Sequence, residues 1–357
     1  MTAQMQQVRV RSMDAVDLEV VAAPRPAAAE VLVRTVLVGI CGSDVHACLG
    51  NHPFIDLPYQ PGHEAVGVVE ATGAEVDNFA VGDRVVVEPN LHCGRCPQCK
   101  AGRYNICQFL QVFGCQTPGA MAERFTIAAD RVHPIPDALS DELAILIEPM
   151  ATPVHAVAKA GDLRGRSVAV LGAGPIGLFV LLAAKHAGAS RVLVTDLLES
   201  KRERALRMGA DAVLAADDGR FADRARAELG AAADVVFDCV SREQSVTQAV
   251  DLVTKGGLVV IIGVGQPGST PIRLDLVQDR ELRIEGALMY VSQDFRTAME
   301  LIGSGVVVAE ELISSVFPLQ EAAAAFAAAR DPAQVKVLVR VSGQPVTATY
   351  QPRSAHV

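Results

Sequence analysis

Short β-type runs, broken by glycine and proline, dominate roughly the first 150 residues of the chain. Three of these runs are rich in valine and other β-branched residues and are interpreted as strands: Val31–Val38, Ala65–Ala71 and Arg84–Glu88. Runs of this composition that are bounded by turn residues are typical of strands. The first part of the chain is therefore predicted to be a β-rich domain.

From about Ser167 the pattern changes to short apolar runs that alternate with longer segments of helical periodicity. The predicted strands are Val168–Leu171, Arg191–Thr195, Ala212–Leu214, Asp234–Cys239 and Leu258–Gly263, and the predicted helices are Ile176–Ala187, Lys201–Met208 and Ser245–Val253. Short apolar runs suit strands that are buried on both faces. The alternation therefore predicts a doubly wound parallel sheet that is covered by helices on both sides.

The last part of the chain adds helices near Phe295–Gly303 and Leu319–Ala329 and a final strand, Lys336–Val341. A strand that follows the parallel-sheet domain can return to the first domain. Because the chain is too long for one hydrophobic core, we predict two domains. Residues 1–154 and 291–357 form the first and residues 155–290 the second, with residues 343–357 as a frayed tail.

A glycine-rich segment, V-L-G-A-G-P-I-G, follows the first strand of the second domain. It matches the G-x-G-x-x-G pattern in the context that dinucleotide binding requires, between a strand and a helix. Gly172 allows the turn, Gly174 lets the pyrophosphate approach, and Gly177 lets the helix pack on the strand. The helix begins near Pro175 and Ile176, and its N-terminus is predicted to face the phosphates.

Asp196 ends the second strand of this unit, about twenty residues after the last glycine, where a carboxylate binds the ribose 2′-hydroxyl. The same carboxylate would repel a 2′-phosphate, so the sequence favours NAD over NADP. Leu197 follows, where an NADP enzyme often has a phosphate-binding residue. Lys201 either flanks the adenosine or belongs to a solvated helix face.

Composition and charge narrow the range of binding partners and cellular locations. The 357 residues carry a formal net charge of −9, which disfavours nonspecific binding to nucleic acid or anionic membranes. The most apolar stretch, Val168–Ala189, is interrupted by the motif glycines and is better explained as a buried strand and helix than as a membrane span. The N-terminal MTAQMQQVRVRS lacks the apolar core of a signal peptide, so a cytoplasmic location is expected.

The eight cysteines indicate metal binding rather than disulfides, because four of them follow the pattern C-x2-C-x2-C-x7-C. Four thiolates complete a tetrahedron around zinc and leave no open position, so the site is predicted to be structural. The bacterial ferredoxin spacing and its following proline are absent, which argues against an iron–sulfur cluster. The four residues are Cys93, Cys96, Cys99 and Cys107.

A second, more dispersed set of candidate metal ligands comprises Cys41, the pair His63-Glu64, and Glu148. Sulfur, imidazole and carboxylate together suit zinc. About three protein ligands would leave a position for water or a substrate oxygen, and an open zinc polarises that oxygen and lowers its pKa. Whether Glu64 or Glu148 contacts the metal, directly or through water, is left open by the sequence.

The surrounding motifs resemble those of the zinc-dependent medium-chain alcohol dehydrogenases over nearly the whole chain. The runs G-H-E-A-V-G-V-V and G-D-R-V-V-V-E-P are similar to that family's first domain, and the cysteine cluster falls where the family carries its structural zinc. The resemblance implies a GroES-like β-rich catalytic domain, a Rossmann NAD-binding domain and hydride transfer from an alcohol to NAD. Cys41 and His63 correspond to catalytic zinc ligands, and Glu64 to a ligand or an exchangeable neighbour. Glu148 matches the glutamate of the polyol (sorbitol) branch, where the classical enzymes have a cysteine.

The resemblance also implies roles for three residues beside the catalytic zinc. Asp44 would accept a hydrogen bond from His63 and fix its tautomer. Ser43 would hydrogen-bond the substrate hydroxyl, and His46 would pass its proton to solvent. Without the resemblance, turn capping would explain Ser43, and a surface loop would explain His46.

The substrate expected from this branch is a secondary alcohol of a polyol, sugar alcohol or cyclitol, which is oxidised to a ketone. Two departures weaken that match: Ala47 stands where the branch often has tyrosine, and Met289 precedes Tyr290 where it tends to have arginine. The pocket is therefore predicted to suit a less polar or differently shaped alcohol, with L-threonine 3-dehydrogenase-like activity as the nearest alternative. Loop position alone suggests further pocket residues: Cys48, His52, Phe113, Tyr290 and Phe295.

Two functions of other classes remain as alternatives. A metal-free quinone or enone reductase has the same fold but lacks the cysteine cluster and the Cys41/His63 pair. A zinc-ribbon protein that binds nucleic acid disagrees with the acidic charge and the dinucleotide motif. The family resemblance also implies a homodimer or homotetramer, formed through an edge strand of the second domain near Leu258–Gly263 or beyond.

Overall fold

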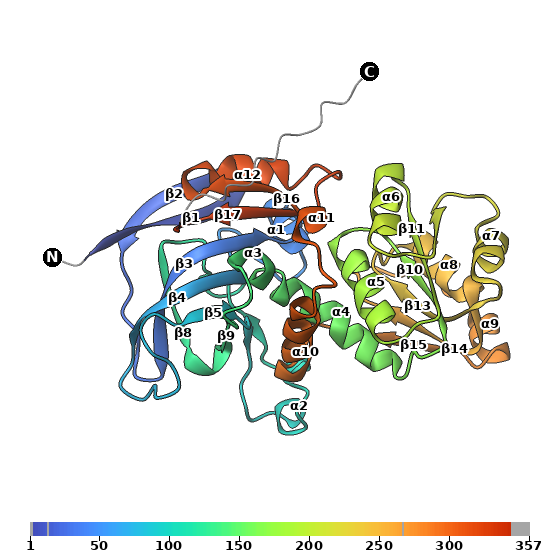
Figure 1. Ribbon diagram of the computed structural model, residues 1–357, viewed down its shortest axis with the longest axis horizontal. Coiled ribbons are helices and arrows are strands. Elements are labelled where there is room, and N and C mark those ends of the chain that lie inside the picture. The colour runs from blue at the N-terminus through green and yellow to red at the C-terminus, as the bar shows by residue number, and fades with distance from the viewer. Residues whose placement is uncertain (1–2, 13, 266–267, 344–357) are drawn as a thin grey trace, which may run out of the picture.

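The computed structural model describes residues 3–12, 14–265 and 268–343, which form two bodies of different architecture (Figure 1). A β-rich body lies on the left of Figure 1 and a parallel sheet with its helices on the right. Helices α4 (Ile147–Ala160) and α10 (Ser292–Gly303) lie between them. Most of the predicted tail, residues 344–357, lies outside the described residues.

The β-rich body is built on a seven-stranded sheet with the order β16-β17-β3-β4-β5-β9, in which β8 also pairs with β3. The three strands predicted for this part of the chain correspond to β3, β4 and β5. Strand β17 pairs antiparallel with β3, with Val339 opposite Val38, so the end of the chain returns to the first sheet as expected. The strands are β3 (Glu30–Ile40), β4 (Glu64–Thr72), β5 (Arg84–Val87), β8 (Arg124–Ala128), β9 (Val132–Pro134), β16 (Ile313–Pro318) and β17 (Lys336–Arg340).

Smaller elements surround this sheet. Strands β1 (Gln4–Ser12) and β2 (Ala15–Ala22) form an antiparallel hairpin that the sequence did not predict, and the side chains of Val8 and Val10 in it are buried. The cysteine-rich lobe carries the two-stranded ladder β6–β7. The remaining elements are β6 (Asn90–Leu91), β7 (Gln111–Val112), α1 (Gly42–Cys48), α2 (Pro97–Lys100), α3 (Asp141–Ala144), α11 (Ala309–Leu312), α12 (Ala322–Ala328), and the 3-10 turns η1 (Tyr104–Ile106), η2 (Ala129–Arg131) and η3 (Leu319–Glu321).

The second body is a six-stranded parallel sheet with the order β12-β11-β10-β13-β14-β15. This is the doubly wound order predicted from the alternating pattern, and the order reverses between β10 and β13, where such sheets bind ligands. Its strands are β10 (Ser167–Leu171), β11 (Arg191–Asp196), β12 (Ala212–Ala215), β13 (Ala233–Asp238), β14 (Val253–Ile261) and β15 (Arg283–Gly286). Its helices are α5 (Pro175–His186), α6 (Glu199–Arg207), α7 (Phe221–Leu229), α8 (Glu243–Leu252) and α9 (Leu274–Asp279).

The edge strand that was expected near Leu258–Gly263 or beyond lies beyond this run. The run Leu258–Gly263 begins within the second half of β14, which pairs with both β13 and β15 and is therefore an interior strand. The two edge strands are β12 and β15, of which β15 lies further along the chain. The uniform apolarity of Leu258–Gly263 reflects burial on both faces, which is a property of interior strands.

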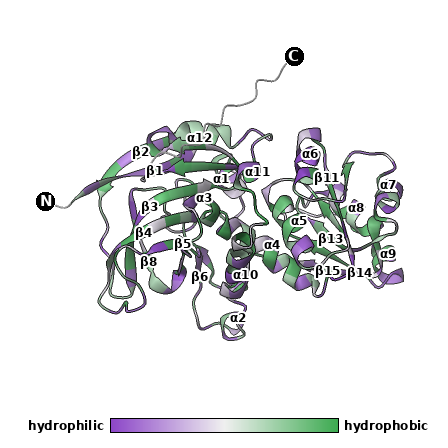
Figure 2. Cartoon of the chain, in the orientation of Figure 1, coloured by the Kyte–Doolittle hydropathy of each residue, from purple (hydrophilic) through white to green (hydrophobic). Residues whose placement is uncertain are grey.

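One hydrophobic core continues from the β-rich body into the parallel sheet. Leu37 and Val66 of the first sheet belong to the same buried cluster as Ile147 of α4 and Phe179 of α5. Figure 2 shows this apolar interior as green segments of α4, α5 and the central strands. Burial of each such side chain contributes roughly 1.5–3 kcal/mol, so α4 ties the two bodies together. Within the described residues, no helix combines the length and apolarity needed to cross a bilayer.

Candidate metal and dinucleotide site

Cys41, His63 and Glu64 come together because β3 and β4 are neighbours in the first sheet. Cys41 directly follows β3 and caps the N-terminus of α1, while His63 directly precedes β4 and Glu64 begins it. Gly39 pairs with Glu64 in the ladder, which places the ends of both strands side by side. One ligand atom from each of Cys41, His63 and Glu64 lies within 4.8 Å of the others. A thiolate, an imidazole and a carboxylate at these separations fit a zinc ion with an open position.

Glu148, the fourth sequence candidate, lies on the α4 side of this cluster and outside the set of mutually close ligand atoms. Its carboxylate is buried, and Oε1 accepts a hydrogen bond from the Tyr290 hydroxyl at 2.6 Å. Burial raises the pKa of Glu148 to about 7. Glu148 is thus held beside the metal cluster by a residue from the segment that precedes α10.

Asp44 lies behind His63, although not at hydrogen-bonding distance. The distance from Asp44 Oδ2 to His63 Nδ1 is 3.9 Å, beyond the range of a hydrogen bond, so the predicted bond between them is not formed. Asp44 instead accepts the Cys41 N–H at 2.9 Å and the Tyr59 hydroxyl at 2.9 Å. These bonds orient Asp44 at the first turn of α1 and fix the backbone of Cys41. His63 Nδ1 also lies 3.8 Å from the Cys115 thiol, a neighbour that no motif indicated.

Ser43 and His46 are both on α1, three residues apart, and therefore lie on one side of this helix. Ser43 is half-buried and His46 is exposed, while Cys41 at the start of the helix is half-buried. Exposure thus increases from the metal cluster toward His46. This arrangement suits a route by which a proton leaves the site for solvent.

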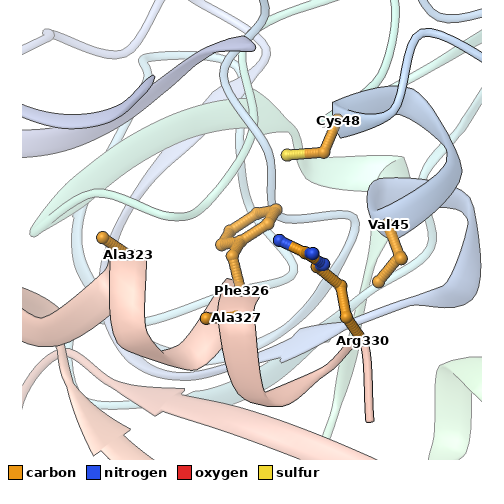
Figure 3. A pocket seen from close by; sticks show the side chains of 6 residues that line it. All are labelled: Val45, Cys48, Ala323, Phe326, Ala327 and Arg330. Atoms are coloured by element: carbon orange, nitrogen blue, oxygen red, sulfur yellow. The ribbon is translucent and has the colours of Figure 1, made fainter. Parts of the chain in front are cut away.

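The remaining pocket candidates lie in different surroundings. Cys48 is buried and faces a small cavity between α1 and α12, as Figure 3 shows, and its thiol lies 4.0 Å from the Ser12 carbonyl. Phe113 packs against Phe125 with their ring centroids 5.3 Å apart. Both are therefore packing residues. His52 is half-buried, and its Nδ1 accepts the Phe54 N–H at 3.2 Å.

The four clustered cysteines converge in a lobe that projects from the β-rich body at α2. Their sulfurs lie within 4.8 Å of one another, and three separations are 3.5, 3.8 and 4.0 Å. Tetrahedral zinc with bonds of about 2.3 Å requires sulfurs roughly 3.8 Å apart, so the geometry fits zinc. Backbone hydrogen bonds, first of all at Cys99, lower the pKa of Cys96 to about 6, whereas burial and the neighbouring thiols raise the pKa of Cys99 to about 12. Gly94 and Gly102 turn the chain with φ of 67° and 74°, values that favour glycine.

Replacement of Cys96 by serine is expected to remove one zinc per chain and to lower the melting temperature by about 5 °C or more. The lobe has little apolar core of its own, so metal binding supplies its folding free energy. Zinc analysis and differential scanning calorimetry measure both effects. Lys100→Ala, an exposed change in the same lobe, is the control and leaves both values unchanged. A Cys96→Ser chain with full zinc content would contradict the assignment.

A buried glutamate that the sequence did not single out joins the cysteine lobe to the start of α10. Glu88, in the G-D-R-V-V-V-E-P run, is fully buried. It accepts hydrogen bonds from Tyr104 Oη at 2.6 Å, His133 Nε2 at 2.6 Å, Ser292 Oγ at 2.8 Å and Arg131 Nη1 at 3.1 Å. Burial opposes the effect of these bonds, yet together they lower the pKa of Glu88.

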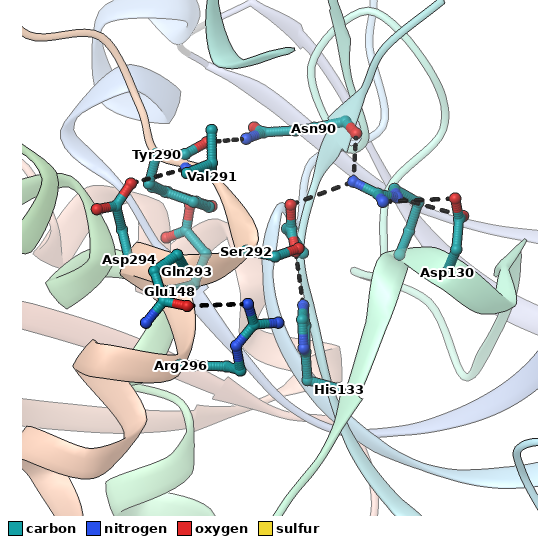
Figure 4. Close-up of polar contacts among 12 residues, drawn as sticks. Asn90, Asp130, His133, Glu148, Tyr290, Val291, Ser292, Gln293, Asp294 and Arg296 are labelled. Atoms are coloured by element: carbon teal, nitrogen blue, oxygen red, sulfur yellow. Dashed lines mark hydrogen bonds and ion pairs between the residues drawn. The ribbon is translucent and has the colours of Figure 1, made fainter. Parts of the chain in front are cut away.

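The chain next to Ser292 is fixed by a second contact from the β-rich body. Asn90 Nδ2 donates to the Tyr290 carbonyl at 2.7 Å (Figure 4). The side chain of Tyr290 reaches Glu148 on the other side of the same segment. The Glu88 contacts and the Asn90 contact therefore position Tyr290, and through it Glu148, at the metal cluster.

The glycine loop turns the chain sharply between β10 and α5. Gly172 has φ of 97°, and the chain turns there from β10 toward α5. A Cβ on Gly177 would lie 1.8 Å from the Gly172 carbonyl oxygen, so only glycine fits this close packing. A Cβ on Gly174 would meet no protein atom within 4 Å, so that face is open. Pro175 and Ile176 begin α5, whose N-terminus is directed toward the same space.

Asp196 ends β11 beside this loop. Its Oδ2 accepts the Ala173 N–H at 2.9 Å and its Oδ1 accepts the Leu198 N–H at 3.0 Å, so the carboxylate is anchored between the glycine loop and the turn after β11. Leu197 is exposed and Lys201 is half-buried on α6. Arg202, which the sequence did not single out, donates to the carbonyls of Asp196 and Leu197 at 2.8 and 2.7 Å and stabilises this turn.

The chain is similar in sequence and structure to several known dehydrogenases. Residues 27–137 match the alcohol dehydrogenase GroES-like domain, and residues 175–304 match the zinc-binding dehydrogenase model. The chain is 35% identical to sorbitol dehydrogenase of Bacillus subtilis strain 168 over 82% of this chain and 84% of that protein. It is 34% identical to D-xylulose reductase A of Aspergillus niger, over 87% of this chain and 89% of that protein. A crystal structure from Escherichia coli CFT073, a short chain alcohol dehydrogenase complexed with NADH, superposes with a TM-score of 0.89 and 28% identity, over 95% of this chain and 100% of the other.

Proposed function

We propose that this protein oxidises a secondary alcohol to a ketone with NAD. The chain belongs to the zinc-dependent alcohol dehydrogenases and to their polyol dehydrogenase-like members. The observation that carries this proposal is the cluster of Cys41, His63 and Glu64, which offers three ligands for one metal ion. A four-thiolate site is closed and supports structure, whereas a three-ligand site can admit a substrate oxygen. The three-ligand cluster is therefore the proposed active centre.

The residues around this centre have distinct proposed roles. Zinc held by Cys41, His63 and Glu64 would polarise the alcohol oxygen and lower its pKa. Ser43 would accept the proton of the substrate hydroxyl, and His46, exposed on the same side of α1, would release it to solvent. Glu148, fixed by Tyr290, would orient a further substrate hydroxyl or a water molecule. NAD would take up the hydride from the carbinol carbon.

NAD rather than NADP is the proposed cofactor because of Asp196. Its carboxylate is held at the end of β11 by the N–H groups of Ala173 and Leu198 and cannot swing away without losing both bonds. A fixed negative charge at this position accepts the ribose 2′-hydroxyl and repels a 2′-phosphate. Lys201 on α6 is the proposed neighbour of the adenosine.

The proposed substrate is a polyol or related vicinal diol of modest polarity. Two relatives are named for sorbitol and for D-xylulose, a sugar alcohol and a ketose. Near the centre, Ala47 is fully buried and offers no polar group, and Met289 stands where a cationic side chain would hold further hydroxyls. Glu148 remains as a polar group for a second hydroxyl. L-threonine 3-dehydrogenase-like activity is the alternative within the same chemistry.

A substrate panel tests this function. With NAD, we expect polyols and vicinal diols, such as sorbitol, xylitol and 2,3-butanediol, to raise absorbance at 340 nm with kcat/KM at least about tenfold above L-threonine and primary alcohols. One hydrogen bond to a buried polar group such as Glu148 is worth roughly 1.5–3 kcal/mol, which gives this ratio. The same panel with NADP should be slower by a factor of about ten or more. Preference for L-threonine would favour the alternative, and no reduction of either cofactor by any alcohol would refute the function.

A homodimer or homotetramer is also proposed. The support within this chain is the edge strand β15, which pairs with β14 on one side only. Two exposed apolar residues lie at the beginning of α9: Ile272 just precedes this helix and Leu274 is its first residue. An unpaired edge and an apolar rim are features that a second copy can cover.

A further inference from the structure

Lys336 is a buried cation beside the proposed metal site, and neither the motifs nor the proposed mechanism uses it. It begins β17, the strand that returns from the end of the chain to pair with β3. The residue is only 3% exposed. Its ammonium donates to Glu64 Oε1 at 2.6 Å and lies 3.5 Å from the Ile40 carbonyl. A lysine is almost never buried to this extent unless it is paired, so its position needs a reason.

The two oxygens of Glu64 are in different environments. Oε1 is bound by Lys336, whereas Oε2 is buried and has no hydrogen-bond partner. A Cβ on Gly39, the cross-strand partner of Glu64, would lie 2.0 Å from Oε2, so glycine makes the space in which this oxygen sits. Buried carboxylate oxygens without a partner are rare and call for an explanation such as a metal ion. One oxygen of Glu64 is thus held by the ammonium and the other is free for a metal.

The negative groups of the site surround Lys336. Burial lowers its pKa, but the charges of Glu64, Cys41 and Glu148 outweigh burial and raise it. When Glu64 binds a divalent metal through one oxygen, the ammonium of Lys336 is a second positive charge on the same carboxylate. Lys336 is therefore the second cation of the site and competes with the metal for Glu64.

We propose that Lys336 is a positioning residue that restricts Glu64 to one oxygen on the metal and so keeps the fourth position open for substrate. The inference rests on the proposed function, because it assumes a metal held by Cys41, His63 and Glu64. Without the ammonium, the buried carboxylate has the metal as its nearest cation. Its second oxygen then turns to the metal, which closes the site in the manner of a structural zinc.

Replacement of Lys336 by methionine tests this role, because methionine is of similar length and carries no charge. We expect zinc at the catalytic site to be released to excess chelator about tenfold more slowly than in the wild type, while kcat/KM falls about 100-fold. The release is followed by absorbance of a zinc-binding dye. Cobalt substitution gives a second readout, because an added oxygen ligand weakens the visible d–d bands of a four-coordinate ion. A merely structural lysine predicts the opposite: its loss would loosen the site and release zinc faster.

Three further variants complete the test. Arg340→Met removes another ion pair from the same strand, to Glu142 at 2.9 Å, and is expected to leave zinc release unchanged. Lys336→Met combined with Glu64→Gln removes the carboxylate charge and should restore release at least to the wild-type rate. Lys336→Gln keeps a hydrogen-bond donor and should also slow release, so it replaces the methionine variant if that chain does not fold.

The results distinguish failure of the role proposed for Lys336 from failure of the proposed function. Unchanged or faster zinc release from Lys336→Met and Lys336→Gln, in a wild-type background that holds two zinc ions per chain, overturns the role of Lys336 alone. A wild-type chain that binds only the four-cysteine zinc contradicts the proposed function instead.

Discussion

Replacement of Cys41 by serine is expected to lower kcat/KM for the best polyol by a factor of about 1,000 or more and to reduce zinc content from two ions per chain to one. The thiolate of Cys41 is one of only three close ligand atoms at the proposed centre, so its loss leaves two. A catalytic metal contributes several kcal/mol of transition-state stabilisation, and about 4 kcal/mol corresponds to 1,000-fold in rate. Steady-state kinetics and elemental analysis measure the two effects.

The fold around Cys41 provides the control for this experiment. Cys48 lies on the same helix but faces the cavity between α1 and α12, so Cys48→Ala should retain two zinc ions and nearly full activity. The Cys41→Ser chain should unfold at nearly the same temperature as the wild type, because the four-cysteine lobe is untouched. If Cys41→Ser kept its zinc and its rate of NAD reduction, the cluster of Cys41, His63 and Glu64 could not be the active centre.

The elements that were predicted well are those whose burial is uniform. Strands β10, β11 and β13 are covered on both faces, and continuous apolar runs identify them with little ambiguity. The hairpin β1–β2 was missed because several of its positions are exposed and its strands carry polar residues at many of them. Helix α4 was also missed: Pro149 and Pro153 normally argue against a helix, but here tertiary packing between the two bodies overrides that preference.

The residues of the site also differ in how far the sequence could predict them. The clustered cysteines could be predicted from their spacing alone, whereas the pair His63-Glu64 was assigned from the motif around it and from the family that this motif resembles. Lys336 could not, because it is 272 residues from Glu64 and stands in a strand where a lone lysine normally indicates exposure. Tyr290 was named for its loop position, and its contact with Glu148 depends on how the segment before α10 crosses between the bodies. Pairing of distant segments is what single-sequence patterns do not encode.

Two alanine substitutions in the glycine loop are expected to separate cofactor binding from folding. Gly174→Ala should weaken NAD binding about 100-fold, roughly 2.7 kcal/mol, without lowering the melting temperature. The added Cβ meets no protein atom within 4 Å, and the backbone at Gly174 has φ of −74° and ψ of −177°, which alanine adopts readily. The methyl group therefore has only the pyrophosphate to obstruct, and reduced freedom of the unfolded chain can even stabilise the protein slightly. NAD titration by calorimetry and thermal unfolding measure the two properties.

Gly177→Ala is the matched variant three residues along, and it should lower the stability of the fold as well as NAD binding. Its Cβ would lie 1.8 Å from the Gly172 carbonyl oxygen, so the first turn of α5 must move away from the end of β10. Overpacking of a tight contact costs about 1–3 kcal/mol, and this contact involves backbone that cannot rotate away. We therefore expect the melting temperature to fall by about 5 °C and NAD binding to be weak. If Gly174→Ala destabilised the chain as much as Gly177→Ala, the open face at Gly174 would not be the pyrophosphate site. If Gly174→Ala bound NAD normally, the dinucleotide would have to lie elsewhere on the sheet.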